Sequence, residues 1–170
     1  TQWGKAAQLR VAATLLPSNA PVTADVSWGW WTNLAPFALD WECQVRGVES
    51  RKLTADEISC GGDWRAPRLT ATRVQSTLYG GKLDAAANLD VATRELKFSS
   101  KSDFDALKIS PLLGDKAREW LTQFTWEKPP AVQGEGELVL PAWTNLFGAD
   151  WQSEVRPTLH LLGRFRIAEG

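Results

Sequence analysis

Apolar and polar residues alternate at every second position along most of this chain. Residues 8–15, 37–46 and 83–91 show the pattern most clearly. In residues 37–46 the apolar phase consists of Phe37, Leu39, Trp41, Cys43 and Val45. Successive side chains of a β-strand point to opposite faces, so each of these runs predicts a strand with one dry face and one wet face.

The stretch from Arg68 to Phe98 predicts three consecutive antiparallel strands. The first runs from about Leu69 to Tyr79, and Gly80-Gly81 supplies the positive φ angles that a two-residue hairpin requires. A second strand covers residues 83–91, a turn follows at residues 93–95, and a third strand begins at Leu96. Short connections between neighbouring strands predict a meander.

Weaker signals extend the same pattern over the rest of the chain. Gly61, Gly62 and Asp63 predict a further hairpin, and residues 104–109 fit either a strand or a helical turn. Four more strands are expected at Pro21–Trp31, Leu53–Ser59, Gly134–Leu140 and Thr158–Ala168. Together these segments predict a mainly β fold, a curled, groove-like antiparallel sheet of eight or nine strands.

The period changes from two to about 3.6 residues after Ser110. Ser110 followed by Pro111 is a typical helix start, and the sequence predicts one amphipathic helix over residues 111–124. We expect its apolar stripe to cover part of the sheet. That stripe contains Leu113, Ala117, Trp120, Leu121 and Phe124.

Composition narrows the functional classes. A chain of 170 residues has the size of one domain, and with no Met at position 1 we expect it to be a segment of a longer protein. Basic and acidic residues number 19 and 20 and are interspersed, so no nucleic-acid partner is expected. No apolar run reaches the roughly 20 residues that span a bilayer.

One family resemblance rests on the region from Leu53 to Leu113. The turn Leu78-Tyr79-Gly80-Gly81 is followed by Leu83 and by Leu89-Asp90. Further matching positions are Leu96, Asp103, Ala106-Leu107 and Leu112-Leu113. This pattern resembles the carboxy-terminal repeats of AsmA-like proteins.

The resemblance implies a specific function. AsmA-like proteins are long bacterial envelope proteins, usually anchored in the inner membrane, whose β-sheet curls into an apolar groove in the periplasm. They are implicated in phospholipid transport and outer-membrane lipid homeostasis. The resemblance therefore implies a non-enzymatic segment whose partners are phospholipid acyl chains and flanking repeats, with membrane contact only through the parent protein.

The alternating phases themselves fit either a closed core or an open trough. The resemblance favours the trough, with the helix from Pro111 as a partial cover. The predicted lining residues are Leu9, Val11, Phe37, Leu39, Trp41, Leu83, Leu89, Leu159 and Leu161. The predicted helix cover is Leu113, Trp120, Leu121 and Phe124.

Ten tryptophans carry an alternative hypothesis. Trp28 and Trp30 share one phase of a predicted strand, so both belong to the core or form a stacking platform, while Trp31 falls on the other phase. If Trp28, Trp30 or Trp143 forms a stacking platform for sugar rings, the protein would be a carbohydrate-binding β-sandwich module. Cys43 and Cys60 either bridge neighbouring strands in an oxidising compartment or remain buried thiols.

The sequence does not contain a recognisable set of catalytic residues. His160 is the only histidine and lies on a wet phase beside Arg164 and Arg166, which indicates a solvated surface residue. The carboxylate pairs Asp103 with Asp105 and Asp56 with Glu57 do not stand out from the other acids as a glycosidase pair. A small hydrolase is thus the weakest hypothesis, and we expect no enzyme activity, cofactor or metal ion.

Overall fold

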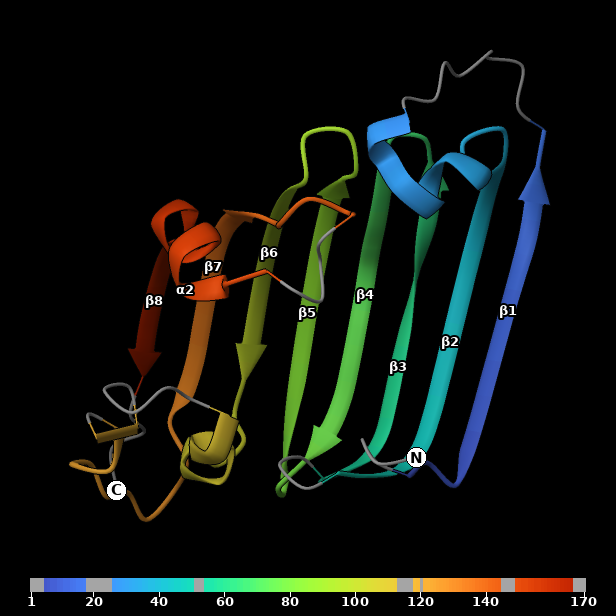
Figure 1. The fold of residues 1–170 in the computed structure, drawn as a ribbon. Helices are drawn as coiled ribbons and strands as arrows, with labels where there is room; N and C mark the ends of the chain where they lie inside the picture. The colour runs from blue at the N-terminus through green and yellow to red at the C-terminus, as the bar shows by residue number, and fades with distance from the viewer. Residues whose placement is uncertain are drawn as a thin grey trace.

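The protein is one antiparallel sheet of eight strands, arranged in the order of the chain (Figure 1). The computed structural model describes residues 5–17, 26–50, 54–112, 118–119, 121–144 and 149–166. The mainly β class and the predicted strand count are confirmed. The strands are β1 (Gln8–Leu16), β2 (Ala38–Glu49), β3 (Thr54–Arg65), β4 (Arg68–Leu78), β5 (Gly81–Asp90), β6 (Glu95–Ser102), β7 (Ala131–Val139) and β8 (His160–Arg166).

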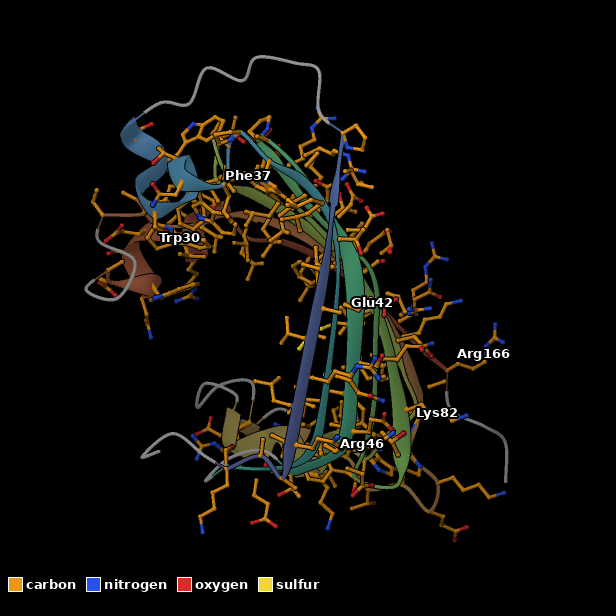
Figure 2. The ribbon with its side chains drawn as sticks, turned by 90° about the vertical axis from the view of Figure 1, so that its right-hand side faces the viewer. Trp30, Phe37, Glu42, Arg46, Lys82 and Arg166 are labelled. Atoms are coloured by element: carbon orange, nitrogen blue, oxygen red, sulfur yellow. The ribbon has the colours of Figure 1, made fainter. Side chains whose placement is uncertain are left out.

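The sheet is curved, and the short helical segments lie on its concave side (Figure 2). At one end, here called the upper end, are η1 (Val26–Asn33), α2 (Trp151–Glu154) and η3 (Arg156–Thr158). At the opposite, lower end is η2 (Ala106–Leu112). The two outermost strands, β1 and β8, do not pair with each other, so the sheet stays unclosed.

A β-bulge and a glycine lie in the middle of the sheet. The register shifts at Gly61/Gly62 and again between Ala71 and Val74, and such bulges bend the strand that carries them. The hairpin predicted at residues 61–63 is wrong, because β3 continues to Arg65. A Cβ atom at Gly62 would lie 1.8 Å from the carbonyl oxygen of Thr70, so this glycine permits a close approach of two strands and not a turn.

The strand predicted at Pro21–Trp31 is also wrong over the part that the structure describes. Residues 26–33 form two short 3₁₀ turns joined at Gly29, whose φ of 59° interrupts any extended run. The hydroxyl of Thr32 donates to the Gly29 carbonyl over 2.9 Å. This arrangement buries Trp28 and Trp31 and leaves Trp30 exposed, a grouping that a strand could not produce.

The meander of β4, β5 and β6 follows the prediction closely. The left-handed residues of the β4–β5 turn are Tyr79 and Gly80, with φ of 51° and 79°. Gly81 opens β5 instead, where a Cβ atom would come within 2.5 Å of the backbone of Phe104. The double glycine therefore serves two needs, a turn conformation at the first position and a close contact at the second.

The structure describes the helix predicted over residues 111–124 only in part, since residues 113–117 and 120 lie outside the described residues. Helical turns start at Asp105, whose carboxylate accepts from the Leu107 amide over 3.1 Å, and Pro111 lies inside the resulting 3₁₀ segment η2. Farther along, Arg118, Glu119 and Leu121 have helical backbone, and Phe124 lies beyond it. The Asp105 carboxylate therefore caps η2, a 3₁₀ segment that the Ser110-Pro111 signal does not predict.

Candidate functional site: the concave face of the sheet

The two faces of the sheet have opposite chemistry. Side chains opposite one another in adjacent strands share a face, so the register defines rows that cross the whole sheet. The row at mid-height is Val11, Cys43, Cys60, Val74, Ala85, Ser100, Gly134 and Gly163. This row contains no charged side chain. It forms the middle of the concave face.

The upper end of the concave face is covered by an aromatic cluster. Trp64 and Val91 are 1% and 0% exposed, beneath Trp28 and Trp31 of η1. Trp31 stacks on Trp64 with ring centroids 5.4 Å apart, and the Trp64 indole donates to the Leu34 carbonyl over 2.8 Å. The covering segment is therefore fixed by both packing and a directed hydrogen bond.

The lower end has a smaller cover. Ala55, Leu78 and Phe104 are buried there, and Ile109 of η2 packs against them. Ring contact between Tyr79 and Phe104, at a centroid distance of 6.4 Å, joins the β4–β5 turn to the segment after β6. Both ends of the concave face are thus packed, and the middle lies between them.

The predicted lining residues divide between the packed ends and the uncovered parts of the face. Leu39 and Leu89 pack against the upper cluster, and Leu83 packs against the lower one. Trp41 is half-buried. The remaining members are exposed, namely Leu9, Val11, Phe37, Leu159 and Leu161.

Uncovered apolar side chains gather toward the two edge strands. Val11 in β1 is 65% exposed and Leu161 in β8 is 62% exposed. The total accessible surface is 12077 Å² for a chain of 18.8 kDa. A compact monomer of this mass exposes about 8,300 Å². An open curved sheet contributes to this excess, because the described residues place no second layer over its convex face or over the middle of its concave face.

Two thiols lie side by side on the middle row. Cys43 and Cys60 are directly opposite partners of β2 and β3, half-buried, and they are not joined by a disulfide. Burial raises the pKa of the Cys60 thiol, and the charge and hydrogen bond of Cys43 raise this pKa further. The neighbouring Trp41 Nε1–H is buried without a hydrogen-bond partner among the described residues, which marks this floor as poor in polar groups.

The tryptophans do not assemble into the stacking platform of the carbohydrate hypothesis. Trp28 is only 6% exposed, and the Trp143 indole donates to the Val91 carbonyl over 2.8 Å. Trp30 is 56% exposed, but its inner face is stacked on Trp31 at 4.0 Å. Of the three candidate residues, one presents an open ring.

The structure describes two of the four residues predicted as the helix cover. Leu121 is buried, whereas Phe124 is 44% exposed. Leu113 and Trp120 lie outside the described residues.

Asp103 and Asp105 form hydrogen bonds that stabilise the fold, and His160 is not part of a catalytic arrangement among the described residues. Asp105 caps η2 and also accepts from the Trp126 indole, while Asp103 accepts from the Lys82 amide over 2.5 Å. His160 is exposed. Within the part of the chain that the structure describes, no three His, Cys, Asp or Glu side chains come together as metal ligands.

Sequence reasoning missed one group of residues on the convex face. Lys82, Lys101, Arg164 and Arg166 come from β5, β6 and β8 and line one hollow. Alternation placed Arg164 and Arg166 on a wet phase, but only the register of four strands shows that they converge with Lys82 and Lys101.

No family model, no curated protein and no solved structure matches the chain. Among the described residues, no helix is both long enough and apolar enough to cross a membrane.

Proposed function

We propose that the concave face binds phospholipid acyl chains and that the chain is a non-enzymatic segment of an AsmA-like envelope protein. In this proposal the parent protein is anchored in the inner membrane and the segment acts in the periplasm, in outer-membrane lipid homeostasis. The supporting observation is the uncharged middle row of eight strands, flanked by exposed apolar residues at both edges.

Burial of hydrocarbon supplies the driving force. Each methylene group removed from water contributes about 0.8 kcal/mol, so a chain lying along the concave face gains affinity without specific polar contacts. The exposed side chains of Leu9, Val11 and Leu161 would lose their contact with water at the same time. Small residues on the β6–β8 side of the middle row, such as Gly134 and Gly163, leave room above the backbone there.

The two edge strands support the proposed contact with flanking repeats. Among the described residues, β1 pairs only with β2 and β8 only with β7, so each edge presents backbone groups that can pair with a further strand. Every strand pair is antiparallel, and with eight strands β1 and β8 run in opposite directions. A strand added at either edge would continue both the alternation and the apolar face.

The test compares neighbouring positions on opposite faces. Leu161 and Leu162 are 62% and 69% exposed, so a glutamate at either position changes net charge equally and disturbs little packing. We expect phospholipid to be extracted from the purified wild-type chain and seen bound in native mass spectra. Leu161→Glu should reduce the bound lipid severalfold, and Leu162→Glu should leave it within error of wild type.

A second pair controls for the choice of strand. Val11→Glu should reduce lipid binding, and Ala12→Glu, on the opposite face of β1, should not. The proposal fails if wild-type protein binds no phospholipid from vesicles or during expression. It also fails if substitutions on the two faces reduce binding equally, because the concave face would then have no special role.

A further inference from the structure

A basic hollow lies on the convex face, on the opposite side of the sheet from the proposed lipid surface. It has a volume of about 650 Å³ and spans β5 to β8. Its charged lining consists of Lys82, Lys101, Arg164 and Arg166 together with Asp84 and Asp103. Figure 2 shows Lys82 and Arg166 projecting outward from the convex side. We call this region the basic hollow.

The register of the strands creates the hollow. Lys101 of β6 is opposite Gln133 of β7, which is opposite Arg164 of β8. Arg166 lies one step farther along the same face, opposite Ala131. Because Ala131 is short, long cationic side chains surround a low point on the surface.

The cations of the basic hollow are unpaired, in contrast to most of those elsewhere on the convex face. Arg46 forms an ion pair with Glu57 at 3.4 Å, and Lys97 approaches Glu95 at 3.2 Å. Arg65 and Arg73 also have carboxylate partners. Among the described residues, no carboxylate lies within ion-pair distance of the four cations of the hollow.

The two acids of the hollow are held by other groups. Asp103 accepts from the backbone amide of Lys82, and Asp84 accepts from the side-chain amide of Gln75 over 2.9 Å. Four cations against two acids leave an excess of two positive charges around the hollow. Because the acids do not neutralise the cations directly, an incoming anion would find free donors.

We propose that the basic hollow binds a phosphate group. Guanidinium groups present paired N–H donors that match phosphate oxygens, and lysines add point charges from the other side. Gln133, opposite both Lys101 and Arg164, adds a neutral polar side chain to the lining. The volume falls in the range of small-molecule sites, so a phosphorylated headgroup or a small phosphate ester fits.

The proposal stands apart from the proposed function, because it uses the opposite face and different residues. The test measures binding of two probes to the full 170-residue chain. One probe is soluble glycerol 3-phosphate, followed by calorimetry, and the other is vesicles of phosphatidylglycerol compared with phosphatidylcholine, followed by sedimentation. Binding to the soluble ester assigns a free phosphate compound, and binding only to phosphatidylglycerol vesicles assigns a lipid headgroup.

Matched variants separate the hollow from general charge. Lys101→Glu and Arg164→Glu should each weaken binding at least tenfold. Arg68→Glu changes net charge equally at an exposed convex position outside the hollow, and it should leave the affinity within twofold. Chemical denaturation should show that all three variants stay folded.

Two results would overturn the proposal. The first is that neither glycerol 3-phosphate nor phosphatidylglycerol vesicles bind. The second is that Arg68→Glu weakens binding as much as Lys101→Glu, since the attraction would then belong to the whole face and not to the hollow. A lipid-binding defect of Leu161→Glu would affect neither result.

Discussion

The packed upper end and the uncovered middle of the concave face are built from the same alternating strands, yet they differ in what lies above them. At the upper end, Trp28 and Trp31 lie over Trp64 and leave it 1% exposed. At mid-height, Val11 in β1 stays 65% exposed. Alternation therefore makes a face apolar, and a separate covering segment decides whether that face becomes core or surface.

The covered ends and the uncovered middle should therefore differ in how much they contribute to stability. The covered ends supply most of the stability, because they contain the buried apolar side chains and burial of apolar surface is the main source of folding free energy. The uncovered middle should contribute little to stability and tolerate substitution, because its side chains are already in contact with water.

Removing the central ring of the upper cluster should destabilise the protein most. Trp64→Ala should lower the free energy of unfolding by about 3–5 kcal/mol, the usual cost of deleting a buried aromatic side chain. It also removes the hydrogen bond to Leu34. Urea denaturation followed by circular dichroism measures the change. Trp30→Ala, at a 56% exposed position, should cost about 1 kcal/mol or less, and equal costs would contradict the comparison.

A covalent link across the middle row should stiffen the uncovered region. Opposite residues of antiparallel strands have Cα atoms about 4.5–5.5 Å apart, within the range of a disulfide. Diamide should therefore oxidise Cys43 and Cys60 to an intramolecular disulfide, two thiol hydrogens passing to diamide as it becomes the hydrazine. The loop closed is close to the 15 residues for which about 3 kcal/mol of stabilisation is expected.

Mass spectrometry should show a loss of two hydrogens in wild type and none in Cys60→Ser. Because the pKa of Cys60 is raised, its thiol stays protonated to higher pH than usual, and alkylation should quicken only as pH rises above the ordinary thiol range. The same shift favours the folded state below the ordinary pKa, and this contribution is lost as pH rises through the raised value. Exclusively intermolecular disulfides would show that the β2–β3 register is wrong.

Adding one methyl group beside the β-bulge should lower the free energy of unfolding by less than Trp64→Ala does. Gly62→Ala brings Cβ into the backbone of Thr70 and should destabilise the protein by about 1–3 kcal/mol, as overpacking does. Gly163 is also on the concave face, but nothing lies within 4 Å of a Cβ atom there. Gly163→Ala should thus leave the denaturation midpoint nearly unchanged. A similar loss at both positions would remove the proposed distinction between them.

The smallest effect is expected in the uncovered middle. Val11→Thr should change the free energy of unfolding by no more than about 0.5 kcal/mol, because the side chain is solvated already. Val91→Thr, at a position with 0% exposure, places a hydroxyl in the upper cluster and should cost about 1–3 kcal/mol. Thermal or urea denaturation of the two variants makes the comparison directly. A large loss in Val11→Thr would mean that β1 is covered in solution.

The sequence predicted the sheet well because alternation is a local signal. Leu39, Trp41 and Val45 needed no distant partner to be recognised as one face. Covering segments were predicted poorly, since their conformation depends on contacts far along the chain. Residues 26–33 turn because Trp31 packs on Trp64 and Trp143, which lie 33 and 112 positions away.

The candidate site was predictable by face but not by exposure. The phase of Leu9 and Leu89 is the same, but only the structure shows that the first is 64% exposed and the second is packed against the upper cluster. The basic hollow could not be foreseen at all, because the convergence of Lys101 and Arg164 depends on the register of three strands. Which side chains of different strands lie next to one another depends on the tertiary structure, and the alternation within one strand does not reveal it.

The central claim, that the uncovered middle of the concave face holds acyl chains, is tested most directly by its own thiols. Cys43 and Cys60 are the two cysteines of the chain and lie on the middle row. Bound phospholipid should slow maleimide labelling of the reduced protein severalfold, while a Ser99→Cys reporter on the convex face, in a chain lacking both native thiols, should react at an unchanged rate. Unchanged labelling of Cys43 and Cys60 in protein that demonstrably carries lipid would contradict the account, because the lipid would then lie elsewhere.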